Sequence, residues 1–175
     1  MKIAVVGCSG SGKTHLAEQL AQKHDLDHIE MDSMAFYGDW TLRPVEEFKS
    51  DIQTRLDEAT TGWVTDGNWS SLDGIHTRLA DQIIWIDLPR HIIMRQLIPR
   101  TIIRVLTRKM LWGTNREPFT NLYSPNPEKN VILWSWKQFH ALRRKYQKYV
   151  SDGSWSHATV VHLRSRKAIS ELLDS

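Results

Sequence analysis

Short apolar runs alternate along the chain with segments whose apolar residues recur every three or four positions. The runs predict strands at Lys2–Val6, His28–Met31, Gly62–Thr65, Gln82–Ile86 and Ala158–Leu163. The periodic segments predict helices at Lys13–Lys23, Val45–Ala59, Pro89–Leu111, Lys129–Val150 and Lys167–Leu173. This alternation is typical of an α/β protein in which helices cover a parallel sheet.

Proline and turn-forming residues interrupt the pattern. Pro99 lies within a predicted helix, and we expect a break or kink there because proline removes a hydrogen-bond donor and clashes with the preceding turn. The segments Ser33–Pro44 and Gly113–Pro127 are rich in turn formers and are predicted to be mobile loops. No repeat or linker divides the chain, so residues 1–175 are expected to form a single domain.

Composition narrows the class of protein. The chain is 41% apolar and 25% charged, which is typical of a globular protein and excludes a disordered one. Its one cysteine, Cys8, excludes an internal disulfide and indicates a reducing compartment. No apolar run is long enough to span a membrane. We therefore expect a cytoplasmic protein without membrane contact.

The net charge of +3 is distributed unevenly. Seven basic residues and no Asp or Glu lie between Leu88 and Arg116, so the rest of the chain is net acidic. A concentrated basic segment implies an anionic partner, either the phosphate of a small molecule or a nucleic-acid backbone.

One motif is specific by itself. Residues 7–14 read GCSGSGKT and match G-x-x-x-x-G-K-[ST] between the first predicted strand and the first predicted helix. Glycines allow successive N–H groups to converge on an anion at a helix N-terminus, Lys13 is suited to bridge the β- and γ-phosphates, and Thr14 to bind Mg²⁺. The predicted nucleotide-binding residues are Gly7, Ser9, Gly10, Ser11, Gly12, Lys13 and Thr14. Many reaction classes share this loop, so the motif alone does not identify the reaction.

Carboxylates follow three of the predicted strands: Asp32, Asp66 and Asp87. The carboxyl ends of parallel strands meet at one edge of a sheet, so all three are expected on the side of the phosphate-binding loop. Asp32 could accept a proton from an acceptor hydroxyl, or it could cap a following turn. Asp87 comes two residues before Pro89, and we interpret it as a helix cap rather than a metal ligand.

The chain resembles the adenylate-kinase-like branch of P-loop kinases, and within it the bacterial proteins labelled "topology modulation protein" or putative adenylate kinase. The segments that carry the resemblance cover most of the chain: GCSGSGKT, HIEMD (28–32), WVTDGNW (63–69), QIIWIDLPR (82–90), WGTNRE (112–117) and HLRSRKAI (162–169). The resemblance implies a three-layer P-loop NTPase fold like that of nucleoside monophosphate kinases, with strand order 2-3-1-4-5 and a lid. It also implies ATP and Mg²⁺ as the nucleotide and its metal.

The same resemblance assigns several residues. Asp66 would orient Mg²⁺ through water, Asp32 would contact the acceptor hydroxyl, and Arg164 would lie beside the adenine of ATP. The loop that contains Gly67, Asn68 and Trp69 would be on the substrate side. Adenylate kinases have a Pro-Arg pair after the corresponding Asp-Gly, and this chain lacks it, so the resemblance does not identify AMP as the acceptor.

The basic segment is interpreted as a lid over residues 99–128. Arg100, Arg104 and Arg108 recur at intervals of four and form one face of a helix, and Arg116 follows in a predicted loop. Arginines that reach the transferring phosphate would neutralise its charge, and a closing lid would exclude water. Alternatively, several of these side chains are simply solvated.

Residues 33–60 are interpreted as the acceptor-binding region. Trp40 and its aromatic neighbours could stack on a ring, and Arg43 could hold an anionic group, or the same aromatics could cover the sheet. Arg164 has a similar alternative, as a basic residue that ends a strand.

The sequence therefore predicts a Mg-ATP-dependent phosphotransferase that acts on a small hydroxyl or phosphate acceptor. The alternative is a nucleic-acid-associated ATPase or DNA topology factor, which the basic segment suggests. A GTPase switch is disfavoured because the chain has no Asn-Lys-x-Asp motif. Under the leading hypothesis the partners are ATP and a small molecule, and nucleic acid is not expected.

Overall fold

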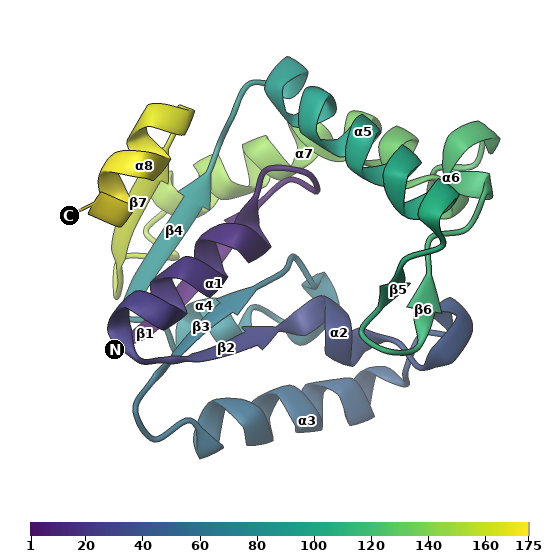
Figure 1. Cartoon of the computed structure of the whole chain (residues 1–175). Coiled ribbons are helices and arrows are strands. Elements are labelled where there is room, and N and C mark those ends of the chain that lie inside the picture. The colour runs from purple at the N-terminus through teal and green to yellow at the C-terminus, as the bar shows by residue number, and fades with distance from the viewer. Residues whose placement is uncertain (175) are drawn as a thin grey trace.

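A five-stranded parallel sheet forms the centre of the molecule (Figure 1). The structure is a computed structural model that describes residues 1–174. The strand order of the sheet is β2-β3-β1-β4-β7. The strands are β1 (Lys2–Gly7), β2 (Asp27–Glu30), β3 (Trp63–Asp66), β4 (Gln82–Ile86) and β7 (Thr159–Leu163). Because β7 is the fifth strand of this sheet, the predicted order 2-3-1-4-5 is confirmed. The chain has an α/β fold with the topology of nucleoside monophosphate kinases.

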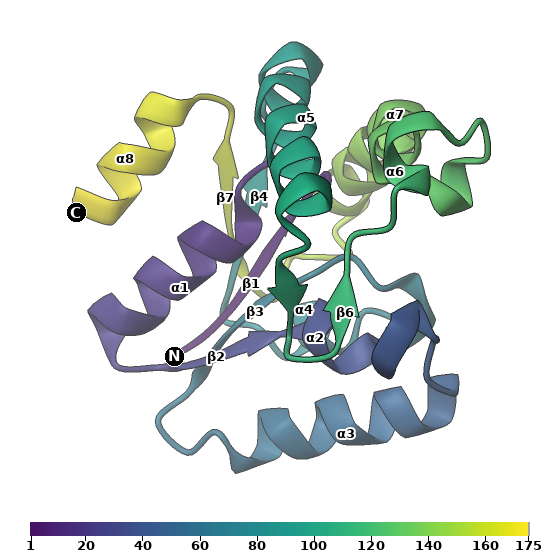
Figure 2. The same cartoon turned by 45° about the vertical axis from the view of Figure 1, so that its right-hand side comes forward.

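Long helices cover the sheet (Figures 1 and 2). They are α1 (Lys13–His24), α3 (Val45–Glu58), α5 (Arg90–Thr107), α7 (Val131–Ser151) and α8 (Arg166–Asp174). Helices α1 and α8 pack on one face of the sheet and α3 on the other. Helices α5 and α7 pack against each other beyond the carboxyl end of β4. Of the helices in residues 1–174, none is both long and apolar enough to cross a membrane.

The buried strands supply both layers of the core because successive side chains point to opposite faces. In β1, Ile3 and Val5 face α1, whereas Ala4 and Val6 face the α3 side. All four are almost completely buried. Burial on both faces explains why this strand appears in the sequence as a continuous apolar run rather than as an alternating one.

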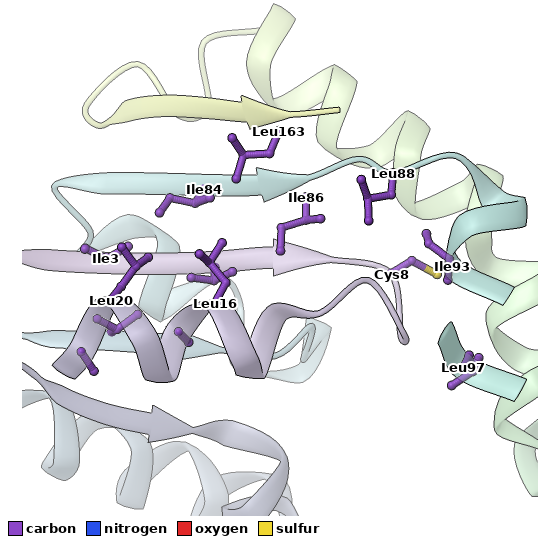
Figure 3. Packing of buried hydrophobic residues seen from close by; sticks show 14 of the residues in the cluster. Ile3, Cys8, Leu16, Leu20, Ile84, Ile86, Leu88, Ile93, Leu97 and Leu163 are labelled. Carbon is purple, nitrogen blue, oxygen red and sulfur yellow. The ribbon is translucent and has the colours of Figure 1, made fainter. Parts of the chain in front are cut away.

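The core on the α1 side continues to the phosphate-binding loop (Figure 3). Cys8 packs there with Ile93 and Leu97 from α5, and Leu16 and Leu20 of α1 pack on the strands behind it. The start of α5 therefore belongs to the rigid core that supports the loop.

Short elements lie within and next to the segments predicted as loops. They are α2 (Met31–Ala35), η1 (Gly38–Trp40), β5 (Met110–Leu111), β6 (Asn115–Arg116), α6 (Thr120–Tyr123) and η3 (Pro127–Lys129). The predicted helix Pro89–Leu111 is too long, because α5 ends at Thr107 and Met110–Leu111 pair with β6. Between β3 and β4 lie η2 (Ser70–Leu72) and α4 (Ile75–Arg78). Strands β5 and β6 pair antiparallel in a small hairpin that approaches α2 (Figure 2).

Of the break or kink predicted at Pro99, the break is wrong, because α5 continues through this residue to Thr107, and the kink stays a prediction. Proline leaves the carbonyl of Arg95, four residues earlier, without its helical donor. Both Arg95 and Pro99 are exposed, so water can donate a hydrogen bond to the Arg95 carbonyl.

Candidate active site

The phosphate-binding loop has a shape that requires glycine at Gly10 and Gly12. Their φ angles are +85° and +95°, and a Cβ on Gly10 would lie 2.8 Å from Cβ of Leu97. The loop is held from outside by two side chains that sequence analysis did not identify. Gln96 Nε2 donates to the Gly10 carbonyl at 2.9 Å, and Ser135 Oγ donates to the Ser9 carbonyl at 3.0 Å. The loop is therefore fixed by α5 and α7 in a shape suited to an anion.

Lys13 is buried at the first turn of α1. Its Nζ donates to the Cys8 carbonyl at 3.2 Å, so the ammonium lies against the loop. Burial lowers the pKa of Lys13, while the charges of Asp32 and Asp66 oppose that change. The cation thus lies near two carboxylates and at the loop that would receive phosphate.

Thr14 and Asp66 place hydroxyl and carboxylate oxygens side by side at the start of α1. Thr14 Oγ1 donates to Asp66 Oδ2 at 2.5 Å, and His28 Nε2 lies 2.9 Å from Asp66 Oδ1. Hydroxyl and carboxylate oxygens next to a phosphate-binding loop fit Mg²⁺, which usually binds through one or two such groups, substrate phosphates and water. His28 was missed, and the available signal was a polar residue within a short strand of the sheet.

A cavity of about 620 Å³ opens in front of the loop. Its walls come from the loop, from the carboxyl ends of the strands, from α5 and from the β5–β6 hairpin. Its lining includes Ser9, Gly10, Gly12, Lys13, Thr14, Asp32, Phe36, Trp40, Trp69, Arg100, Arg104, Trp112 and Glu117. The cavity therefore unites the phosphate-binding loop with predicted acceptor and lid residues.

Asp32 is held in this cavity by Trp69, whose Nε1 donates to Asp32 Oδ1 at 2.8 Å. Burial raises the pKa of Asp32, while Lys13 and the Trp69 hydrogen bond oppose the rise. The alternative interpretation of Asp32 as a helix cap is wrong, because Glu30 has the N-cap position of α2. Asp32 is a carboxylate with increased basicity that faces the phosphate-binding loop.

The three predicted lid arginines at the C-terminal end of α5, Arg100, Arg104 and Arg108, separate into two groups. Arg100 and Arg104 line the cavity, and Arg104 also pairs with Glu117 at 3.6 Å. Arg100 makes no ion pair with any residue in 1–174, and its buried Nε has no hydrogen-bond partner there. Arg108 ends the helix in a left-handed conformation and lies over the ring of Phe119. Arg100 is therefore the arginine best able to bind an anion in the cavity.

The two segments predicted as loops contact each other (Figure 2). The backbone N–H of Trp40 donates to Asn115 Oδ1 at 2.6 Å, and its indole Nε1 donates to the Arg116 carbonyl at 2.5 Å. Phe36 stacks with Trp112, and Trp40 packs edge-on against both rings. These contacts close one side of the cavity with aromatic walls. Trp112 belongs to the WGTNRE segment, but its place in the cavity wall could not be predicted because it depends on contacts with distant residues.

Several predicted site residues lie outside the cavity. Arg43, which precedes α3, pairs with Glu47 and Asp51 of that helix and does not line the cavity. Asn68 bonds to the backbone of Gly7 and accepts from the Tyr146 hydroxyl. Also outside the cavity lining are Gly7, Ser11, Asp66, Gly67, Arg108, Arg116 and Arg164, although Asp66 bonds to Thr14, which lines it.

The interpretation of Asp87 as a helix cap is wrong. Pro89 has the N-cap position of α5, and among residues 1–174 no side chain caps that end. The Asp87 carboxylate is instead buried between His162 Nε2, at 3.0 Å, and Arg143 Nε, at 3.1 Å. These partners come from β7 and α7, so Asp87 joins three elements behind the phosphate-binding loop.

Comparison with known proteins gives one distant similarity. No family model matches the chain. The chain is 28% identical over 131 residues to an adenylate kinase from Listeria monocytogenes serotype 4a (strain HCC23). The match covers 59% of this chain and spans only 61% of the length of that protein. The chain thus combines the sheet topology of nucleoside monophosphate kinases with a distant sequence similarity to an adenylate kinase.

Proposed function

We propose that the chain is a Mg-ATP-dependent phosphotransferase that transfers the γ-phosphate of ATP to a small hydroxyl or phosphate acceptor. The observation that carries this proposal is that the phosphate-binding loop and Asp32 open into one cavity, beside Arg100, which makes no ion pair within residues 1–174. The distant similarity to an adenylate kinase supports the same chemistry at the level of the family.

The loop would bind the triphosphate. Its backbone N–H groups and Lys13 would contact the β- and γ-phosphates. Thr14 and Asp66 would hold Mg²⁺, which neutralises phosphate charge when it is bound. The proposed position of Arg164 beside the adenine remains part of this hypothesis, since Arg164 follows β7 at the same edge of the sheet.

Asp32 would act as the general base. It takes the proton of the acceptor group, whose oxygen then forms a bond to the γ-phosphorus as the bond to the β–γ bridging oxygen breaks and ADP leaves. The raised pKa of Asp32 makes it a better proton acceptor than an ordinary aspartate. Trp69 keeps the carboxylate oriented through its hydrogen bond.

The lid would supply charge and exclude water. Arg100 and Arg104 reach the cavity from α5, where they would stabilise the charge on the transferring group. The contacts of Trp40 with Asn115 and Arg116 hold the hairpin over the acceptor side. Exclusion of water would prevent hydrolysis of ATP in place of transfer.

The aromatic walls indicate the shape of the acceptor. Phe36, Trp40, Trp69 and Trp112 line the same cavity as Asp32. Rings of this kind favour an acceptor with a flat ring, such as a nucleoside or nucleotide. The preference for a flat ring follows from these walls alone. It does not depend on the Pro-Arg pair that adenylate kinases have and this chain lacks.

The test is a transfer assay with γ-labelled ATP and a panel of nucleosides, nucleotides and sugar acids. We expect the label to appear on one class of acceptor, and Asp32→Asn to reduce that transfer by about 100-fold or more. Asp39→Asn is the matched control, because the same substitution lies outside the cavity lining. If duplex DNA accelerates ATP turnover and no small acceptor does, the result would favour the nucleic-acid-associated ATPase instead.

A further inference from the structure

A second cavity, of about 460 Å³, lies on the other side of the β3–α4 connection from the candidate active site. Its walls come from that connection, from α4 and from the C-terminal half of α7. Trp69 is the residue that lines both cavities. The second cavity contains none of the phosphate-binding residues from Ser9 to Thr14, so a ligand there would not compete for the same contacts.

The charges around this cavity favour an anion. Lys145 and Arg78 line it, and neither forms an ion pair within residues 1–174. Lys145 Nζ lies over the ring of Tyr149, 5.7 Å from its centre. Asp73 also lines the cavity, but its charge is balanced by Lys49 at 2.9 Å. The uncompensated charge on the walls is therefore positive.

His76 places an unsatisfied polar atom in the same wall. The side chain is only 4% exposed, and its Nδ1 has no hydrogen-bond partner within residues 1–174. An unpaired buried polar atom destabilises the folded chain, and a ligand with a hydrogen-bonding group would satisfy it. Burial lowers the pKa of His76 to about 4, so the ring is neutral at pH 7 and can accept from a ligand hydroxyl.

Aromatic rings complete the lining. Tyr146 stacks with Trp155 at 5.6 Å between ring centres, and Tyr149 lies 5.4 Å from Trp155. All three rings line the cavity. Such walls favour a ligand with a flat apolar body, because aromatic pairs gain energy beyond the area they bury.

The walls of the second cavity are hydrogen-bonded to the candidate active site. Trp69 donates to Asp32, and Asn68 bonds to the backbone of Gly7 at the start of the phosphate-binding loop. The Tyr146 hydroxyl donates to Asn68 Oδ1 at 2.8 Å. A ligand that shifts Trp69, Asn68 or Tyr146 would therefore act directly on residues that position the loop and Asp32.

We propose that this cavity binds a small aromatic anion as a second ligand, and that its occupancy changes the affinity of the phosphate-binding loop for nucleotide. Lys145 contacts the anionic group, the Tyr149 and Trp155 rings contact the flat body, and His76 contacts a polar substituent. The effect on nucleotide binding passes through Trp69 and Asn68.

The test is calorimetric titration of the whole chain with 4-hydroxybenzoate, which carries a carboxylate, a ring and a hydroxyl. We expect saturable binding with a Kd on the order of 1 mM or tighter, and at least about tenfold weaker binding in Lys145→Ala. Lys148→Ala is the matched control, since this lysine lies one turn along α7 and outside the cavity, and it should bind as the unaltered chain does. Circular dichroism establishes that each variant is folded.

Two further titrations locate the ligand and test its effect. Lys13→Ala should leave the binding of 4-hydroxybenzoate unchanged, and loss of binding in that variant would place the probe in the other cavity and overturn the proposal. The Kd for Mg·ATP should change at least about threefold when the probe is saturating, because coupling between two sites is reciprocal. No saturable binding of the probe, equal binding in Lys145→Ala, or an unchanged Kd for Mg·ATP would each contradict the proposal.

Discussion

Trp69 Nε1 donates a hydrogen bond of 2.8 Å to Oδ1 of Asp32, from a residue 37 positions later in the chain. Asp32 lies in α2, directly after β2, and Trp69 lies in the connection that follows β3. Strands β2 and β3 are neighbours in the sheet, which brings the two side chains together. The bond stabilises the ionised form of a carboxylate whose pKa burial raises. It therefore sets the basicity of the group that we propose as the general base.

Replacement Trp69→Phe should raise the pKa of Asp32 further, because the hydrogen bond to the charged carboxylate is lost while the ring that packs against Phe48 is kept. A base acts only when it is ionised, so the acid side of the pH–rate profile should move to higher pH. Carbon-13 NMR of the Asp32 carboxyl group measures the pKa directly. Trp136→Phe, on the exposed side of α7, should change neither quantity. An unaltered Asp32 titration in Trp69→Phe would show that the bond does not set its pKa.

Arg100 and Arg108 should differ sharply although both belong to the same basic segment. Arg100 lines the cavity without an ion pair among the described residues, whereas Arg108 lies over Phe119 outside it. We expect Arg100→Ala to reduce kcat for phosphoryl transfer by about 100-fold, as for loss of one transition-state donor, and Arg108→Ala to change it less than about twofold. Steady-state rates at saturating ATP measure both. Equal losses would mean that the whole basic face acts only as a diffuse charge.

Asn115→Ala should loosen the contact between the hairpin and the acceptor side. Asn115 is buried, and its side chain accepts the backbone N–H of Trp40. Loss of a hydrogen bond worth about 1 kcal/mol predicts roughly fivefold faster hydrogen exchange at the Trp40 amide. Asn126→Ala removes a similar side chain that bonds only within its own segment, and it should leave this amide unaffected. Unchanged protection in Asn115→Ala would contradict a role for this contact in closure.

The sheet and the phosphate-binding loop could be predicted because the signals that specify them are local. The run Gln82–Ile86 forms β4 with the expected bounds, and GCSGSGKT joins β1 to α1 as its glycines require. The ion pairs of Arg43 with Glu47 and Asp51 also join residues that are close in the chain, since Arg43 lies two residues before α3 and both carboxylates are on that helix.

The closing contacts could not be predicted because they join distant segments. Each strand of the β5–β6 hairpin has only two residues. Trp40 bonds to Asn115 and Arg116, which lie 75 and 76 positions later in the chain. The role of Asn68 depends on Tyr146, 78 positions later. The position of Asp87 depends on partners from two other elements. Tertiary packing decides these contacts, and neither periodicity nor motif spacing specifies them.

His76 should make the protein sensitive to acid. Its pKa is lowered from 6.5 to about 4 in the folded chain, so protons bind the unfolded chain first as pH falls. Proton uptake by the unfolded chain lowers the free energy of unfolding. The decrease begins near pH 6.5 and reaches about 3 kcal/mol at about pH 4. Urea unfolding at a series of pH values should show that loss, and His76→Gln should reduce it. The exposed replacement His24→Gln should not, and equal acid sensitivity in all three chains would assign the loss to other groups.

The central claim is that the loop formed by residues 7–14 binds a triphosphate through Lys13. Calorimetric titration with Mg·ATP tests it most directly, with Lys13→Ala as the altered chain and the exposed Lys137→Ala as the control. We predict saturable binding that Lys13→Ala weakens by at least about 100-fold and that Lys137→Ala leaves unchanged, because a buried cation at the phosphates contributes several kcal/mol. Absence of heat in the unaltered chain, or equal affinity in Lys13→Ala, would contradict the claim.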